Sequence, residues 1–194
     1  GRSVVRTHAV DANLVGVGEM GIGNTTPSAA ITALLTDKTV DEVTGNGTGI
    51  DEETRSRKVA VIEQAIAASD PDPTDPLDVL RCVGGFEIGG LVGVALEAAS
   101  QRTPVVVDGF ITGAAALIAA KIEPRVVDYL LASHASVEPG HQAQLDMLGL
   151  ESCFDYGMRL GEGTGAAVAV SVYRAACAAH TEMSTFAEAG LETE

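Results

Sequence analysis

Short apolar segments alternate with alanine-rich segments of helical character along most of the chain. The segments predicted to be strands are residues 13–18, 79–83, 104–107 and 129–132. The helices expected between and after them are residues 27–35, 51–68, 91–100, 114–120, 142–148 and 166–180, with a short last helix in 183–190. Strands that are apolar throughout and alternate with helices predict βαβ units and a parallel sheet that is covered on both faces.

The first turn, residues 16–27, lies between a predicted strand and a predicted helix and holds four glycines within eight positions. Such a backbone allows a ligand to approach closely, although a strand-to-helix turn can also be only a turn. Glu19 stands inside this turn, where its carboxylate would face whatever binds there. Pro27 suits the first helical position, and Thr26 suits the N-cap.

A second glycine-rich loop, residues 44–49, precedes the helix predicted at 51–68. Free amides in such a loop can cradle a phosphate. Acidic residues at 51–53 discourage an anion at the helix end itself, so the glycines would have to bind it. Lys58 is the nearby cation, and a solvated helix residue is the simpler interpretation of this lysine.

The turns that follow the predicted strands should meet at one edge of the sheet. In parallel α/β sheets, ligands bind in the crevice beyond the carboxyl ends of the strands. We therefore expect Gly21, Gly85, Gly109 and Ser136 to surround a single pocket. This convergence favours an enzyme that acts on a small molecule.

Glu162 lies between Gly161 and Gly163, where the helix predicted at 166–180 begins. Amides at a helix N-terminus would keep this carboxylate ionised, and the small neighbours leave space for a ligand. The alternative is an acidic residue that only stabilises the helix dipole.

Three other sites are suggested by partial motifs. Gly16, Gly18 and Gly21 match the spacing of a dinucleotide-binding fingerprint, but no strand precedes the acidic residue that should follow. An NAD-dependent oxidoreductase stays open as an alternative on this pattern alone. Asp108, His134 and Ser136 invite comparison with serine hydrolases, although the chain has no Gly-x-Ser-x-Gly elbow at a strand end. His134 and His141 lack a third ligand at motif-like spacing, so we expect no metal.

Composition limits the class of partner. The chain has 194 residues, enough for about one domain, and its 46% of hydrophobic residues can build a sizeable core. A net charge of −15 argues against a nucleic-acid backbone or an anionic membrane as partner. Three scattered cysteines and the lack of a signal sequence or a long apolar run indicate a cytoplasmic protein.

Five motifs, taken together and in order, resemble nicotinate-nucleotide–dimethylbenzimidazole phosphoribosyltransferases, enzymes of cobalamin lower-ligand assembly. The motifs are Gly-Glu-Met-Gly-Ile-Gly-Asn-Thr-Thr at 18–26, Val-Gly-Gly-Phe-Glu-Ile at 83–88, Val-Asp-Gly-Phe at 107–110, Ser-His-x-Ser at 133–136 and Gly-Glu-Gly-Thr-Gly-Ala at 161–166. The resemblance runs from about residue 13 to residue 190. Family members are much longer at the N-terminus, so the chain corresponds to their C-terminal part, and sheet strands and much of the base pocket belong to the rest.

The resemblance implies a three-layer α/β/α fold with a mostly parallel, Rossmann-like sheet, plus C-terminal helices of a small helical domain. On this basis we expect an α/β nucleotide-binding core at 1–160 and C-terminal helices at 161–194. It also implies a homodimer and no cofactor.

The implied reaction moves ribose phosphate from nicotinate mononucleotide to dimethylbenzimidazole, giving α-ribazole 5′-phosphate and nicotinate. Glu162 matches the family's catalytic glutamate and Glu19 a second carboxylate near the ribose. The positions that match phosphate and ribose binding are Gly21, Gly47, Lys58, Gly109 and Ser136. A nucleotide-binding module without catalysis remains an alternative, because part of the pocket lies outside the chain.

Overall fold

The computed structural model describes residues 1–47 and 49–190. The strands within them form one parallel sheet in the order β1-β2-β3 and pair in register over their full length. Their bounds are β1 (Val15–Val17), β2 (Val105–Val107) and β3 (Leu130–Ala132). The predicted α/β class and the parallel sheet are confirmed, and three of the four predicted strands are found.

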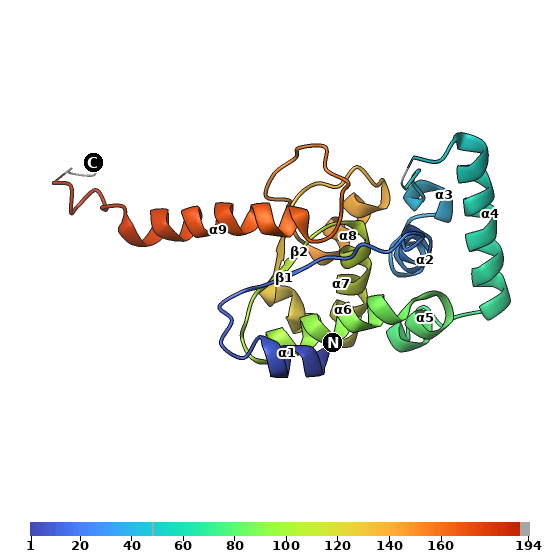
Figure 1. Ribbon diagram of the computed structural model, residues 1–194, viewed down its shortest axis with the longest axis horizontal. Helices are drawn as coiled ribbons and strands as arrows, with labels where there is room; N and C mark the ends of the chain where they lie inside the picture. Colours follow the sequence, from blue (N-terminus) through green and yellow to red (C-terminus); the bar gives the residue numbers. More distant parts are fainter. Residues whose placement is uncertain (48, 191–194) are drawn as a thin grey trace.

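Helices make up most of the remaining described chain (Figure 1). In chain order they are α1 (Arg2–His8), α2 (Thr25–Leu35), α3 (Val40–Val43), α4 (Glu52–Ser69), α5 (Pro76–Val83), α6 (Phe86–Ser100), α7 (Phe110–Ile122), the 3₁₀ helix η1 (Pro124–Tyr129), α8 (Gly140–Leu148) and α9 (Thr164–Glu182).

Both faces of the sheet are covered by helices. Val105 and Val107 belong to the main hydrophobic core, which α2, α6 and α7 complete. Val106 belongs to a second, smaller core with Ala166 and Ala169 of α9. Neighbouring side chains of a strand point to opposite faces, so β2 enters both cores and has no place for a polar residue.

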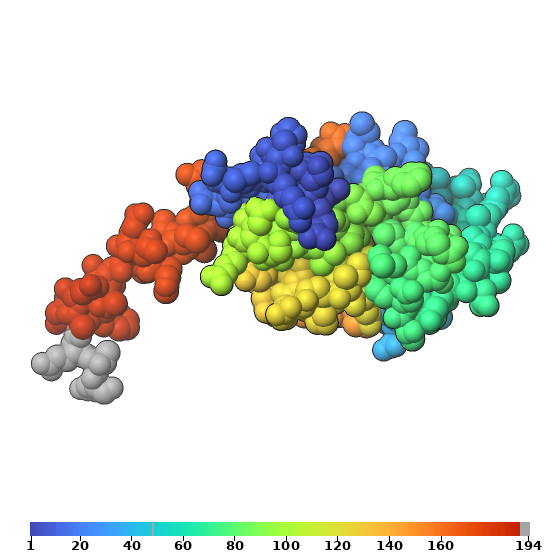
Figure 2. Space-filling view, turned by 90° about the horizontal axis from the view of Figure 1, so that it is seen from below, coloured from blue at the N-terminus to red at the C-terminus, as the bar shows by residue number. Residues whose placement is uncertain are grey.

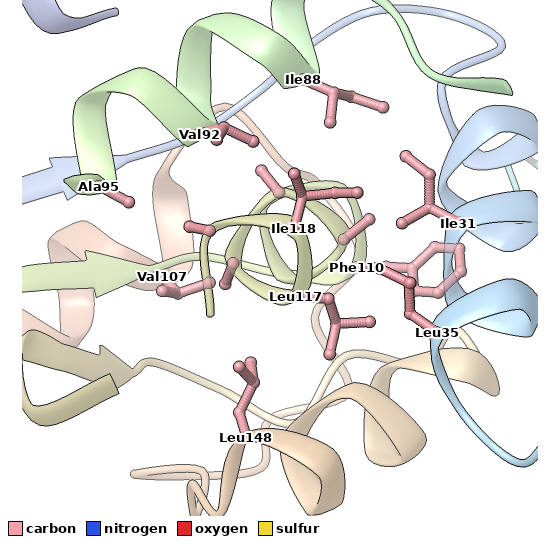
Figure 3. Packing of buried hydrophobic residues seen from close by; sticks show 14 of the residues in the cluster. Ile31, Leu35, Ile88, Val92, Ala95, Val107, Phe110, Leu117, Ile118 and Leu148 are labelled. Carbon is pink, nitrogen blue, oxygen red and sulfur yellow. The ribbon is translucent and has the colours of Figure 1, made fainter. Parts of the chain in front are cut away.

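Helix α7 is the central helix of the main core (Figure 3). Nine of its 13 residues are buried, so it lacks the polar face of a surface helix. Side chains of α2, α6 and α8 surround it, among them Ile31, Ile88 and Leu148. Burial of each such side chain is worth roughly 1.5–3 kcal/mol, so this packing fixes the position of the turn that precedes α7.

The strand predicted at residues 79–83 is wrong, because these residues form the last turns of α5. Asp75 caps this helix by accepting hydrogen bonds from the backbone amides of Leu77 and Asp78, and Pro76 occupies its first turn. Val79 and Val83, four residues apart, are its buried residues. Four apolar residues interrupted by Arg81 do not distinguish a strand from one face of a short helix, and here the N-terminal cap favours the helix.

Several helix boundaries also differ from the prediction. Helices α6 and α7 begin at Phe86 and Phe110, four to five residues early, because the glycine before each serves as the N-cap. Helix α2 begins at Thr25 with Asn24 as N-cap, so the N-cap predicted at Thr26 is wrong and Pro27 is the third helical residue.

The short helix predicted in residues 183–190 is also wrong, because this segment forms turns. Thr185 and Glu188 cap one another, and the amide of Ala189 donates to the carbonyl of Thr185 at 2.9 Å. Every side chain of the segment is exposed. A single turn without a packing surface does not extend into a helix.

Helix α9 projects from the body of the molecule as an arm (Figures 1 and 2). Only Gly165, Ala166 and Ala169 near its N-terminus are buried. The hydroxyl of Tyr173 donates to the carbonyl of Ala132 in β3 at 2.6 Å, and most residues beyond it are exposed. None of the helices within residues 1–47 and 49–190 combines the length and hydropathy that crossing a membrane requires.

Candidate functional site

A cavity of about 830 Å³ lies beyond the carboxyl ends of the three strands, and we call it the main cavity. It is lined by the turns that follow β1, β2 and β3, by the loop that precedes α4, and by residues 159–161. The predicted site residues on its wall are Glu19, Gly21, Gly47, Lys58, Gly109 and Ser136. Gly85 does not join this edge, and that prediction is wrong because Gly85 connects two helices instead of ending a strand.

A smaller cavity of about 490 Å³, the side cavity, lies against the N-terminal half of α9. Its lining is made of small and apolar residues with two carboxylates, namely Gly16, Gly18, Glu19, Met20, Glu162, Gly163, Ala166, Ala167 and Val170. Glu19 and Met20 line both cavities. The backbone amide of Glu162 donates to the carbonyl of Glu19 at 2.9 Å, which joins the two turns that carry the predicted carboxylates.

The side chain of Glu19 is oriented by its own turn. Its Oε2 accepts a hydrogen bond from the backbone amide of Gly21 at 2.7 Å. Gly18, just before it, packs so closely on Gly163 that a Cβ atom would overlap the backbone of that glycine. The first glycine-rich turn therefore fixes Glu19 and at the same time receives the loop of Glu162.

The Glu162 loop has an unusual backbone. Gly161, Glu162 and Gly163 have φ angles of 79°, 59° and 75°, so all three are left-handed. A non-glycine residue in this region costs roughly 1 kcal/mol or more and persists only where its surroundings hold it. Residues held in this way are common at functional sites, and this one faces a cavity.

Asp108 holds this loop from the turn after β2. Its Oδ2 accepts from the amide of Gly163 at 3.1 Å, and its Oδ1 accepts from the amide of Ala166 at 3.0 Å. The carboxylate is buried and stabilises the N-terminus of α9, where free amides favour negative charge. Asp108 is therefore a capping residue for α9.

The hydrolase comparison is not supported by these contacts. Ser136 bonds to His141 through its backbone amide, which donates to Nδ1 at 3.0 Å. His134 lies 3.0 Å from the hydroxyl of Ser133 and 3.9 Å from Asp108. Burial lowers the pKa of His141 to about 4, and nearby His134 adds to this. A neutral His141 can accept the bond from Ser136 and so fixes the position of that residue on the cavity wall.

Neither the dinucleotide fingerprint nor a metal centre is found in the described chain. Gly21 precedes the N-cap of α2 by three residues. Asp37, the acidic residue considered for the fingerprint, follows α2 instead of a second strand. Across residues 1–47 and 49–190, His, Cys, Asp and Glu side chains do not gather in groups of three or more that could hold a metal ion.

Lys58 reaches into the wall of the main cavity from α4. Its Nζ donates to Oγ1 of Thr25 at 2.8 Å and to the carbonyl of Gly45 at 3.4 Å. Burial lowers the pKa of Lys58, and the nearby Glu138 opposes this effect. Gly47, with φ of 53°, lies beside it: a Cβ atom there would stand 3.8 Å from Nζ. The interpretation of Lys58 as a solvated helix residue is wrong, and Thr48 of the same loop lies outside the described residues.

Two helices begin at the main cavity. Gly109 is the N-cap of α7, and its amide donates to Oγ1 of Thr112 at 2.9 Å. Thr25 and Thr26 at the start of α2 line the same space. Amides at helix N-termini attract anions, so these two helix ends and Lys58 offer positive groups on a wall that also carries the carboxylates of Glu19, Asp108 and Glu138.

Glu138 and Arg159, which also line the main cavity, are not among the site residues predicted from the sequence. Glu138 is buried, and burial raises its pKa although Lys58, the Gly47 amide and Arg159 act against the change. Arg159 lies three residues before Glu162 on an exposed loop. Neither residue stands in a motif with a known physical role, so only the position of Glu138 near Lys58 and Gly47, and that of Arg159 near Glu138, reveals them.

Comparison with known proteins identifies the family. A family model described as "Phosphoribosyltransferase" matches residues 1–191. Nicotinate-nucleotide–dimethylbenzimidazole phosphoribosyltransferase of Desulforudis audaxviator is 56% identical over 179 residues, which are 92% of this chain and 51% of that protein. The protein of the same name from Syntrophotalea carbinolica is 54% identical over 191 residues, which are 98% of this chain and 54% of that protein.

A solved structure agrees with the sequence comparison. The crystal structure of CobT from Thermus thermophilus superimposes with a TM-score of 0.92 at 43% identity, over 100% of this chain and 58% of that one. The chain thus spans about half the length of the curated relatives it matches. The resemblance carried by the five motifs is confirmed, and the chain belongs to the nicotinate-nucleotide–dimethylbenzimidazole phosphoribosyltransferase family.

Proposed function

We propose that this chain carries the reacting centre for phosphoribosyl transfer from nicotinate mononucleotide to 5,6-dimethylbenzimidazole. The products are α-ribazole 5′-phosphate and nicotinate, and the step belongs to the assembly of the cobalamin lower ligand. The observation that supports this most is the junction of the two cavities, where Glu19 lines both and its carbonyl accepts from the amide of Glu162. Two carboxylates on joined turns suit a reaction between two bound substrates.

The main cavity is the proposed site of the nucleotide donor. A phosphate repelled by a net charge of −15 needs focused positive groups, and Lys58 with the N-termini of α2 and α7 supplies them. Gly21, Gly47 and Gly109 have no side chain and so allow the phosphate and ribose to lie close to the backbone of their turns, and Ser136 adds a hydroxyl on the same wall. These five positions are the binding residues that we assign to the donor.

The side cavity is the proposed site of the base. Glycines and alanines leave room for a flat ring, and Met20 and Val170 offer apolar contact. One ring nitrogen of the benzimidazole attacks C1′ of the ribose, and the bond from C1′ to the pyridine nitrogen breaks, so nicotinate leaves with that electron pair. The proton on the other ring nitrogen becomes acidic as the new bond forms and passes to the carboxylate of Glu162.

Glu19 has a different role in this proposal. The pyridinium leaving group already carries positive charge, so its departure requires no general acid. Positive charge instead develops on the ribose ring as the old bond breaks. A carboxylate fixed beside the ring stabilises this charge, and the bond from the Gly21 amide fixes Glu19 before the reaction.

Nucleotide binding without catalysis is the second candidate. The chain covers only 51% and 54% of the length of the two relatives. This favours binding without catalysis, because turnover would need pocket residues from the part of the relatives that the chain does not cover. The same comparison motivates the structural part of the proposal: a doubly wound, Rossmann-like three-layer core at 1–160, to which further strands add, and a C-terminal helical part at 161–194. Helix α9 is the helix of this part within the described residues, and 191–194 lie outside them.

We also propose self-association to a homodimer. Helix α9 exposes Val168 and Val172, and the turn segment after it exposes Phe186; exposed apolar groups of this kind favour association. Static light scattering on this chain at high concentration should give a mass above that of the 19.8 kDa monomer. A monodisperse monomer would contradict this part of the proposal.

The function is tested by Glu162→Gln in a polypeptide of the relatives' full length that contains these residues. The substitution keeps the shape of the side chain and removes proton acceptance. Loss of a general base should lower kcat by about 10²–10⁴-fold, while calorimetry should find the affinity for nicotinate mononucleotide little changed. Glu19→Gln should impair both binding and turnover.

Glu182→Gln, on the exposed end of the same helix, is the matched control and should leave both quantities unchanged. If Glu162 only favours the helix dipole, its substitution should cost at most about 0.3–1 kcal/mol of stability and leave turnover near normal. Full turnover by Glu162→Gln would remove the base assignment and leave a nucleotide-binding crevice.

A further inference from the structure

His134 is a buried polar residue on the wall of the main cavity, and the reaction as described above has no use for it. It belongs to the Ser-His-x-Ser motif at 133–136, which follows β3. Its side chain is only 3% exposed, so any hydrogen bond of the imidazole is made within the protein or with a ligand in the cavity.

The imidazole ring of His134 is held from three sides. Oγ of Ser133 lies 3.0 Å from its Nδ1, and the ring of Phe154 stacks on it with the two ring centroids 6.2 Å apart. On the third side, a Cβ atom at Gly165 would overlap Nδ1, so the start of α9 packs directly against the ring. The position of each ring nitrogen is therefore fixed before a ligand binds.

The contacts of Ser133 determine which ring nitrogen carries the proton. Oγ of Ser133 lies 2.6 Å from the carbonyl oxygen of Asp108, which can only accept, so the single hydroxyl proton is donated there. Oγ must then accept from Nδ1 of His134, and Nδ1 carries the ring proton. Burial lowers the pKa of His134, although Asp108 and Asp155 oppose this effect, so the ring is neutral near pH 7. Its Nε2 is then a bare acceptor.

Nε2 of His134 lies where a ligand in the main cavity can reach it. Within residues 1–47 and 49–190, Nε2 makes no hydrogen bond, and it is not one of the fully enclosed polar atoms that lack a partner. A Cβ atom at Gly109 would stand 3.6 Å from Nε2 and 3.9 Å from the Cβ atom of Ser136. The three residues therefore meet at one point of the cavity wall.

This point lies between the two ends of the proposed donor site. Gly109 and Ser136 belong to the phosphate and ribose positions, whereas Gly165 on the other side of the ring follows Glu162 by three residues. A donor whose phosphate lies near Lys58 and whose C1′ lies near the proposed base places its ribose between them.

A bare acceptor needs an O–H or N–H group from the ligand. Near neutral pH the carboxylate of nicotinate mononucleotide is ionised and its phosphate is mostly a dianion, and the pyridinium nitrogen is bonded to C1′. The two ribose hydroxyls are therefore the hydrogen-bond donors that this nucleotide offers.

We propose that Nε2 of His134 accepts a hydrogen bond from a hydroxyl of the donor's ribose and so selects a ribonucleotide over its deoxy analogue. This inference rests on the proposed function and adds a specificity residue to it. Ser133 and Asp108 are positioning residues, because the Asp108 carbonyl takes the hydroxyl proton and so keeps the ring proton on Nδ1. Asp108 thereby links recognition of the sugar to the turn that also caps α9.

The test is calorimetry on a polypeptide of the relatives' full length with three probes: nicotinate mononucleotide, its 2′-deoxy analogue and its 3′-deoxy analogue. Wild type should bind the ribonucleotide more tightly than at least one analogue by about 5- to 30-fold, as expected when one hydrogen bond is lost and its acceptor stays unpaired. His134→Asn keeps an N–H group near the position of Nδ1 but has no atom at Nε2, so it should lose the preference against one analogue by weakening the ribonucleotide alone. His134→Gln, whose amide reaches the position of Nε2, should restore part of this preference.

Nitrogen NMR of the histidine-labelled wild type is a second measurement and requires no variant to fold. The His134 ring, identified by its proximity to the Phe154 ring, should carry its proton on Nδ1 in the free protein. The Nε2 resonance should shift when nicotinate mononucleotide binds. A proton on Nε2 in the free protein, or an Nε2 resonance that does not respond to the nucleotide, overturns the proposal.

His180→Asn, the same change at an exposed position of α9 outside the main cavity, is the matched control and should keep the preferences of wild type. His134→Asn that keeps them too, or that weakens ribonucleotide and analogues equally, overturns the proposal while leaving phosphoribosyl transfer intact. Wild type that binds the three probes equally has the same consequence. Wild type that does not bind nicotinate mononucleotide overturns the proposed function as well.

Discussion

Substitution of Asp108 by asparagine separates the anchoring of the Glu162 loop from the chemistry of Glu162 itself. Asp108 accepts hydrogen bonds from the amides of Gly163 and Ala166, and its side chain is buried. Asparagine has nearly the same shape but only one acceptor oxygen. Its NH₂ group would face one of the two backbone amides, so that buried donors oppose one another.

The magnitude follows from the two bonds. A hydrogen bond to a charged group contributes about 1.5–3 kcal/mol net, and a buried donor left without a partner costs about 1–3 kcal/mol. Asp108→Asn should therefore lower the free energy of unfolding by about 2–4 kcal/mol. Helix α9 has few other attachments, chiefly Ala166, Ala169 and the bond from Tyr173, so much of the loss should be local.

Two measurements check this reasoning. Urea unfolding followed by circular dichroism gives the global change, and hydrogen exchange read by mass spectrometry should show faster exchange in the first turns of α9 than in α7. Asp155→Asn is the matched control, because Asp155 accepts from the Gly157 amide at 3.0 Å in an exposed turn and should cost less than about 0.5 kcal/mol. Asp108→Asn with wild-type stability and unchanged exchange in α9 would refute the capping role.

Three further outcomes are expected. Lys58→Met should weaken nicotinate mononucleotide binding in calorimetry by at least about tenfold while leaving the fold intact, because one charged contact to phosphate is lost; unchanged affinity would contradict its place in the donor site. The pKa of His141 is lowered in the folded chain from 6.5 to about 4, so as the pH falls this histidine takes up a proton in the unfolded chain before it does so in the folded chain. The free energy of unfolding should therefore fall by up to about 3 kcal/mol between pH 6.5 and pH 4. His141→Gln should flatten the pH dependence of urea unfolding in that window. Arg6 and Arg2 lower the pKa of Glu97 to about 2. The stabilisation of the fold by this pairing is present above pH 4.5 and is lost as the pH falls toward 2. Thermal unfolding of Glu97→Gln should show a lower Tm at pH 7, and an unchanged Tm would mean that this pairing does not hold α1 on α6.

The strands could be predicted where burial on both faces leaves no polar position. Residues 105–107 are fully buried and β-branched, and such a run between helices is typical of a parallel strand. The same reasoning failed at residues 79–83, where Asp75 and Pro76 start a helix that buries Val79 and Val83 on one face. The cap residues were present in the sequence, and they carry more information than the apolar run that follows them.

Of the residues predicted to surround the pocket from turns after strands, Gly21, Gly109 and Ser136 come together in the structure and Gly85 does not. The turns of the first three share one edge because the strands are parallel, which is a property of the topology and not of each residue. Glu138 and Arg159 could not be found in this way. Glu138 interacts with Lys58 and Gly47 across roughly 80 to 90 residues of chain, and Arg159 interacts with Glu138 from a loop without a motif, so neither leaves a local pattern in the sequence.

The turn after β2 lines the main cavity and also contacts the Glu162 loop, which is distant from it in the sequence. Gly109 and Thr112 face the main cavity at the start of α7, while the adjacent Asp108 holds the start of α9 and with it the Glu162 loop. The turn is fixed from behind by the buried α7, so neither contact can move without the other. Glu162 keeps its left-handed backbone because this anchor and the Glu19 carbonyl restrain it from two sides. The position of the proposed base therefore depends on the same few residues that form the wall of the donor site, and a change in that wall should alter proton transfer and nucleotide binding together.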